Sequence, residues 1–159
     1  MRYLALIAWF VTALAGLYML AVWLIENDAT DQRNTASRLP LPVIVGHITL
    51  AVTGLLVWVG YLLYDRRALA WVAFGILGGI AVLGFTMFAR WIPVYRNVGV
   101  VKEPESVPVG APVAPAPAIE FMIDEGPAEG NFPLFIVAAH GAFAVTTVVV
   151  VFLSALYGG

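Results

Sequence analysis

Two histidines are the residues of this chain best suited to bind a ligand. His47 and His140 are the only histidines in the sequence, and each lies in an apolar segment. A titratable ring in such a segment is costly unless it has a partner, so it is a candidate functional site. The surrounding segments also match, since residues 40–53 and 133–146 both read P-x6-H-x3-A-V-T. The repeat favours one shared role for both rings.

The composition is that of an integral membrane protein. Of the 159 residues, 62% are hydrophobic and 11% are charged, whereas a soluble domain averages about half apolar and about a quarter charged. The chain has no cysteine, which excludes disulfides, thiolate metal sites and iron–sulfur clusters. With a net charge of −2 and no basic patch, nothing indicates nucleic-acid binding.

Four apolar stretches are long enough to cross a bilayer as helices. We expect spans at about residues 3–25, 41–64, 68–92 and 132–157, and therefore a single all-α membrane domain, residues 1–159, folded as a four-helix bundle. The first span is expected to be a retained anchor rather than a signal peptide. Pro93 is expected to end the third span, with an extramembrane loop at residues 94–131.

The histidine repeat predicts two duplicated helix hairpins, related by a pseudo-two-fold axis along the membrane normal. A weaker match extends the repeat to the first and third spans, pairing Ala8-Trp9 and Gly16 with Ala70-Trp71 and Gly78. The short charged turn at residues 65–67 favours cytoplasmic termini in a plasma (inner) membrane. Simple counting of Lys and Arg points the other way.

The two histidines are expected at matching depth. The second and fourth spans run in the same direction, with His47 about six residues in and His140 about eight, so their depths agree to roughly 3 Å. The second and fourth helices of a bundle lie diagonally across its core. We therefore expect both rings to point towards one central axis.

The residues around this axis are small enough to admit a large flat ligand. The same helix faces carry Ala51 and Gly54 after His47, and Ala144 and Thr147 after His140. Gly16 and Gly84 fall at a similar depth on the other two spans. The predicted ligand is haem b, with one histidine on each axial side of the iron. Arg90 and Arg96, with Arg38 as a third candidate, are placed to pair with its propionates.

This arrangement resembles the four-helix, cytochrome b-type haem bundles of respiratory membranes. The residues that carry the resemblance are His47, His140, Gly16 and Gly84. It implies electron transfer to or from a quinone, a small oxidant or a redox partner. A homo-oligomer or a larger membrane complex is a separate expectation. Such bundles often have two histidines on each ligating helix. This chain has one histidine on each of these two helices, so at most one bis-histidine haem is expected.

Two other functions stay open. The histidines could hydrogen-bond neighbouring helices in a non-redox accessory or assembly subunit. They could also serve a small transporter or metal-binding protein as a proton or metal site, although no Asp or Glu lies within a span.

Some finer expectations follow from the same sequence. The second ring nitrogens have Thr49, Thr53, Thr146 or backbone carbonyls as available partners. Trp23 and Trp91 are expected in an aromatic interface belt. The acidic segment around Phe121 is expected to fold over the membrane face nearest the histidines.

Overall fold

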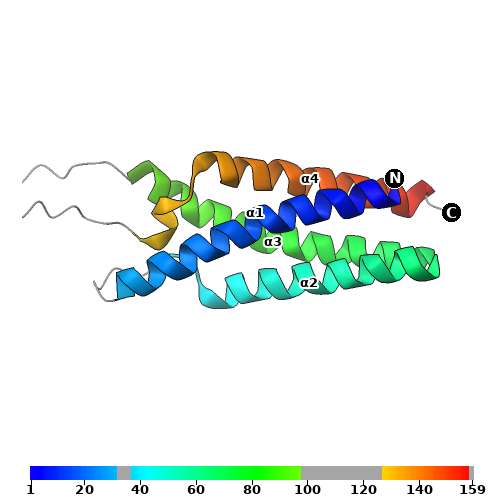
Figure 1. Cartoon of the computed structure of the whole chain (residues 1–159), viewed down its shortest axis with the longest axis horizontal. Coiled ribbons are helices and arrows are strands. Elements are labelled where there is room, and N and C mark those ends of the chain that lie inside the picture. Colours follow the sequence, from blue (N-terminus) through cyan, green and yellow to red (C-terminus); the bar gives the residue numbers. More distant parts are fainter. Residues whose placement is uncertain (32–36, 98–126, 158–159) are drawn as a thin grey trace, which may run out of the picture.

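The computed structural model is a bundle of four long helices: α1 (Arg2–Asp31), α2 (Leu41–Tyr64), α3 (Arg67–Asn97) and α4 (Leu134–Tyr157). A short 3-10 helix, η1 (Ala128–Asn131), precedes α4. The structure describes residues 1–31, 37–97 and 127–157. The start of α1, the end of α4 and the α2–α3 turn lie at one end of the bundle, called here the terminal end, and η1 lies at the other, called the η1 end (Figure 1).

All four helices are long and apolar enough to cross a membrane. Their outer surface is apolar as well. Leu14, Leu56, Phe85 and Val145, one from each helix, are 61–69% exposed. A continuous apolar surface of this kind suits lipid rather than water. Length, composition and surface together indicate a membrane protein.

Two helices extend beyond the predicted spans. α1 runs to Asp31, and α3 continues through Pro93 to Asn97, so the prediction that Pro93 ends the third span is wrong. A proline inside a helix removes one hydrogen bond, but packing holds the last turn in place. Trp91 and Val94 are buried, and the rings of Trp91 and Tyr95 stack across the proline with centroids 4.9 Å apart.

The segment between the third and fourth spans is therefore only partly a loop. Its first residues complete α3, and its last residues include η1. The predicted docking of Phe121 lies outside the described residues.

The bundle consists of two closely packed helix pairs. α2 packs along α3 and α1 packs along α4, each more extensively than any other two helices. α2 and α4 lie on one diagonal and α1 and α3 on the other. Within the described residues, the Cα atoms of diagonal helices do not come within 8 Å of each other. Exchanging α1 with α3 and α2 with α4 maps one close pair onto the other.

Aromatic rings fill the core of the terminal half. Trp9, Trp58 and Tyr61 are buried there together, and the rings of Trp58 and Tyr61 are 4.9 Å apart. Gly54 permits this packing, because a Cβ at that position would lie 3.0 Å from both Trp9 Cζ2 and Ile76 Cγ2.

Polar contacts close the terminal end. Asp65 follows α2 in the left-handed region with φ of 51°, and its carboxylate pairs with Arg2. Arg67 donates hydrogen bonds to the main-chain oxygens of Ala155, at 2.8 Å, and of Leu156. These contacts connect α1 to the α2–α3 turn and satisfy carbonyls at the end of α4.

Replacing Gly54 tests the tight core of the terminal half. Gly54→Ala should lower the stability of the bundle by about 1–3 kcal/mol, the usual cost of overpacking a filled core. Gly78→Ala is the matched control, because nothing lies within 4 Å of a Cβ there, and it should be neutral or slightly stabilising through helix propensity. Thermal unfolding in detergent, followed by circular dichroism, measures both. Equal unfolding temperatures for the two variants would contradict the packing around Gly54.

Candidate functional site: a histidine pair across the core

His47 on α2 and His140 on α4 face each other across the bundle core. Their ring centroids are 6.4 Å apart and the ring planes make an angle of 50°. Each histidine stands six residues after the first residue of its helix. Because the rise per residue is fixed, the two rings lie at equal depth.

The two helices also begin in the same way. The main-chain oxygen of Pro40 accepts hydrogen bonds from the N–H groups of Val43 at 2.9 Å and Ile44 at 3.2 Å. The oxygen of Pro133 accepts bonds of 2.9 and 3.2 Å from the corresponding residues of α4, Ile136 and Val137. Matched helix starts give the two histidines matched positions.

A carbonyl of the neighbouring helix holds each ring. His47 Nδ1 lies 3.1 Å from the oxygen of Ile80 on α3, and His140 Nδ1 lies 2.9 Å from the oxygen of Thr12 on α1. A carbonyl oxygen can only accept, so Nδ1 donates, and Nε2 of the neutral ring keeps its lone pair. Among the predicted partners, the structure selects carbonyls. The hydroxyls of Thr53 and Thr146 donate within their own helices.

One turn after each of these carbonyls, a glycine touches the same ring. A Cβ at Gly16 would lie 3.1 Å from His140 Cε1, and a Cβ at Gly84 would lie 3.3 Å from His47 Cε1. Any side chain at these positions would press on the imidazole. Both halves of the site are therefore built alike, from a histidine, a carbonyl on the next helix and a glycine four residues after it.

Gly84 is thus the structural counterpart of Gly16, and the predicted match of Gly16 with Gly78 is wrong in register. Nothing lies within 4 Å of a Cβ at Gly78, and Trp71 is 41% exposed where Trp9 is 4% exposed. The sequence contains the signal that gives the correct register. Residues 13–23 and 81–91 both read A-x2-G-x2-M-x-A-x-W.

The small residues beyond the histidines have surroundings of their own. Ala51 and Ala144 are half-buried. The space in front of Gly54 is filled by Trp9 and Ile76. Thr147 is buried, with its hydroxyl 2.8 Å from the oxygen of Phe143 and 3.3 Å from the hydroxyl of Thr12. Gly54 and Thr147 therefore serve helix packing.

The three arginines lie towards the η1 end. Arg90 donates a 3.3 Å hydrogen bond to the main-chain oxygen of Arg38. Both arginines line an open hollow together with Ser37, Pro40, Ala89 and Pro93. Arg96 stands twelve residues after Gly84, roughly 18 Å further along the helix axis. The structure brings Arg38 and Arg90 together and leaves Arg96 apart.

A buried carboxylate closes the η1 end of the core. Glu129 of η1 has no exposed surface. Its carboxylate accepts hydrogen bonds from the Ser37 hydroxyl at 2.8 Å and from the Arg38 main-chain N–H at 2.6 Å. Its main-chain oxygen accepts the indole N–H of Trp91 at 3.0 Å, and the indole N–H of Trp23 donates to Ser37 at 3.1 Å.

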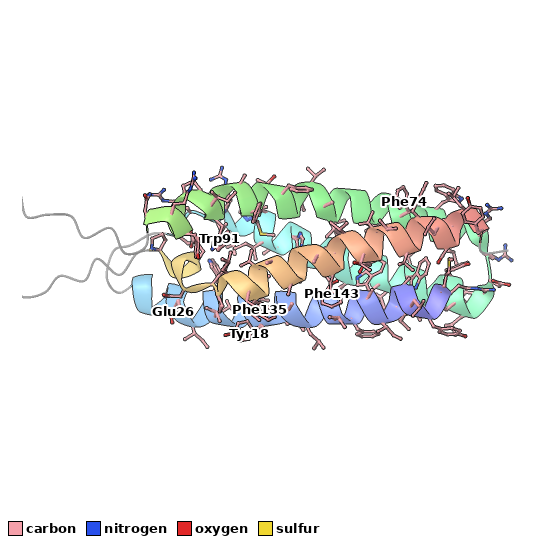
Figure 2. All side chains as sticks on the ribbon, turned by 90° about the horizontal axis from the view of Figure 1, so that it is seen from above. Tyr18, Glu26, Phe74, Trp91, Phe135 and Phe143 are labelled. Carbon is pink, nitrogen blue, oxygen red and sulfur yellow. The ribbon has the colours of Figure 1, made fainter. Side chains whose placement is uncertain are left out.

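This arrangement corrects the expectation for two tryptophans. Trp23 and Trp91 are 8% and 4% exposed, so they pack inside the bundle instead of facing an interface. Figure 2 labels Trp91 near the η1 end. Nothing in the sequence distinguishes Glu129 from the other acids of its segment. Its role comes from contacts with residues far away in the chain.

The separation of the two histidine rings can be compared with that of two ligands on one metal ion. In the described parts of the chain, no three His, Cys, Asp or Glu residues form a metal-binding group, and a bare ion needs more than two protein ligands. A histidine nitrogen binds a metal at about 2.0–2.1 Å, with the ring centroid roughly 1.2 Å behind it, so two histidines on opposite sides of one metal have centroids about 6.5 Å apart. The observed separation is 6.4 Å.

Fold and site together define a four-helix protein with four candidate membrane spans and one histidine pair across its core. No protein-family model, curated protein or solved structure matches this chain.

The geometry predicts the tautomer of both histidines. In protein prepared without added metal or haem, both neutral rings should carry the proton on Nδ1, because each Nδ1 faces a carbonyl. Long-range proton–nitrogen NMR of histidine-labelled protein in detergent distinguishes the two ring nitrogens. Protonation on Nε2 in either ring would contradict the observed ring orientation.

Proposed function

We propose that the protein is a membrane haem b protein that transfers electrons, with one haem held between His47 and His140. The observation that carries the proposal is the pair of facing rings, 6.4 Å apart, with both Nδ1 atoms bound to carbonyls. The haem iron supplies a one-electron couple. With His47 and His140 both bound to it, the group would suit electron transfer rather than oxygen binding.

The residues of the chain position this group and keep it dry. The Nε2 atoms of His47 and His140 would hold the iron. Hydrogen bonds from Nδ1 to Thr12 and Ile80 orient the rings and increase their strength as ligands. Gly16 and Gly84 leave each ring the room it needs. The apolar helices around the pair keep water from the iron.

The two hairpins, α1–α2 and α3–α4, are duplicated copies related by a pseudo-two-fold axis along the membrane normal. Two sequence patterns support this, P-x6-H-x3-A-V-T in α2 and α4 and A-x2-G-x2-M-x-A-x-W in α1 and α3. The matched bonds to Pro40 and Pro133 and the matched glycine contacts support it as well. The axis runs between the two rings.

The haem serves one side of the plasma (inner) membrane. With the termini in the cytoplasm, as the short charged turn at Asp65–Arg67 favours, the haem lies towards the outer face. The terminal half of the core has no histidine and is filled by aromatic rings, so it offers no second haem site. The electron partner, whether a quinone, a small oxidant or a protein, therefore acts at the η1 end.

The arginine roles follow from their positions. Arg38 and Arg90 line one hollow at the η1 end, which supports them as partners of the haem propionates. Arg96 is too far along α3 to share that role. A homo-oligomer or larger membrane complex is compatible with the apolar outer surface, which lipid or another subunit would cover.

A second candidate function rests on the same hydrogen bonds. Each histidine already joins two helices through Nδ1, His47 joining α2 to α3 and His140 joining α4 to α1. This is also what a purely structural histidine does in a membrane protein. In that case the chain is a non-redox accessory or assembly subunit, and the purified protein is colourless.

The absorption spectrum of the wild-type protein and of variants that lack one histidine tests the proposal. Wild-type protein expressed with ample haem should purify with a Soret band and a sharp α-band on reduction. His47→Ala and His140→Ala should each lose the bis-histidine spectrum, because one axial ligand is gone. Arg90→Gln should keep the spectrum and change only the potential or the retention of haem. A well-folded but colourless wild-type protein would contradict the haem proposal and favour the structural-subunit function.

The glycines that touch the rings provide a finer test. Gly16→Ala and Gly84→Ala should each weaken haem binding by about 10–100-fold, as loss of ligand orientation does, because a Cβ displaces the imidazole. Gly141→Ala is the matched control. It adjoins His140, but nothing lies within 4 Å of a Cβ there, and it should bind haem like wild type. Haem titration of the apoprotein measures all three, and an equal loss in the control would contradict the assigned contacts.

A further inference from the structure

The two halves of the histidine site differ in the side chains behind the carbonyls. The carbonyl that binds His140 belongs to Thr12, whereas the carbonyl that binds His47 belongs to Ile80. Two turns after its histidine, α4 carries Thr147, and α2 carries a glycine at the same offset. At these positions one half of the site therefore has two hydroxyls where the other half has none.

The two hydroxyls contact each other between α1 and α4. Thr12 Oγ1 lies 3.3 Å from Thr147 Oγ1. Each hydroxyl also donates at 2.8 Å to the carbonyl four residues before it in its own helix, of Ala8 and Phe143. Two hydrogens thus serve three contacts, so one hydrogen is shared between its own helix and the other hydroxyl. Thr147 is 2% exposed, so water does not compete for this contact.

Helix α4 therefore holds Thr12 at two points. The main-chain oxygen of Thr12 points towards the C-terminus of α1 and accepts from His140 Nδ1. Its side chain leans towards the N-terminus of α1 and meets Thr147. α1 and α4 run in opposite directions (Figure 1), and Thr147 stands seven residues after His140, roughly 10 Å along the axis. Two contacts on either side of Thr12 oppose both sliding and rotation of α1 against α4.

On the other side of the site, apolar packing takes the place of the second contact. Ile80 has no polar side-chain atom, and Gly54 leaves room for Ile76, whose Cγ2 would lie 3.0 Å from a Cβ at the glycine. Apolar contact is non-directional, so it fixes the carbonyl of Ile80 less sharply than a hydrogen bond would. The distance from Nδ1 to the carbonyl oxygen follows the same order, being 2.9 Å at His140 and 3.1 Å at His47.

We infer that Thr147 is a positioning residue for His140. Through the hydroxyl of Thr12, it holds the Thr12 carbonyl against His140 Nδ1, and it does not act on His47. This coupling belongs to the protein alone and needs no occupant between the rings. Its consequence for the haem rests on the proposed function. A histidine whose Nδ1 is better oriented by a hydrogen bond is a stronger metal ligand, so His140 and His47 would be unequal ligands of the iron.

Proton–nitrogen NMR of both rings, in protein prepared without haem or metal, tests the inference. Thr147→Val keeps the branched shape and removes the hydroxyl. It should weaken the bond to the carbonyl, shift the Nδ1–H proton signal of His140 upfield and leave that of His47 in place. Thr12→Val, which keeps the carbonyl, should cause the same shift from the other helix. Thr147→Ser retains a hydroxyl and should keep the wild-type signal.

Thr146→Val is the matched control. The hydroxyl of Thr146 is exposed and donates at 2.9 Å to the carbonyl of Ala142 in its own helix, so both ring signals should stay as in wild type. If Thr147→Val moves both ring signals alike, the hydroxyl acts on the whole bundle, and if it moves neither, the coupling does not exist. Either result overturns the inference. Should Thr147→Val fail to fold, Thr12→Val decides by the same criterion.

Haem titration gives a second measurement. Thr147→Val should weaken haem binding, but by less than the about 10–100-fold that loss of a direct partner of the ligand costs, and Thr147→Ser should restore it. A protein that binds no haem refutes the proposed function, and the response of His140 in the metal-free protein still decides the inference. A haem protein whose His140 signal is unchanged in Thr147→Val and Thr12→Val overturns the inference alone.

Discussion

The rest of the site depends on the hydrogen bond between each histidine and a carbonyl inside the neighbouring helix. Those carbonyls, of Thr12 and Ile80, already accept the N–H of the residue four positions on, which in each case is a glycine. The ring uses the second lone pair of the oxygen. Because that residue is glycine, the helices can approach closely enough for the bond to form. One contact thus sets the ring orientation, the free nitrogen and the spacing of each close helix pair.

The two ends of the core are chemically different, although the helices repeat. At the terminal end, Trp9, Trp58 and Tyr61 occupy the interior. At the η1 end, Trp23 and Trp91 stand in equivalent positions of α1 and α3, but a single segment covers both. Trp91 therefore bonds to η1 directly and Trp23 bonds through Ser37. Within the described segments, the resulting cap holds a buried carboxylate, Glu129, on the side nearer the histidines.

Particular residues show which features of the structure the sequence predicted and which it did not. Leu41–Tyr64 coincides with the predicted second span, because length and hydropathy decide such a helix. The equal depth of His47 and His140 followed from a repeat and a fixed helical rise. The predicted alignment of α1 with α3 is wrong. It paired Trp9 with Trp71 because the residue types are identical, but Trp9 is buried and Trp71 is exposed. The pattern ending at Trp23 and Trp91 gives the register that agrees with the contacts.

The sequence by itself determined four apolar helices, a pair of histidines at one depth and the absence of cysteine chemistry, because these depend only on composition, length and spacing. The tertiary structure decided the rest. It selected Nδ1 as the donor, paired Gly16 with His140 and Gly84 with His47, carried α3 past Pro93 and buried Glu129. Each of these depends on how a helix is rotated about its axis and which residues of distant segments it meets. Side chains from other helices set both, and spacing along one helix contains no information about them.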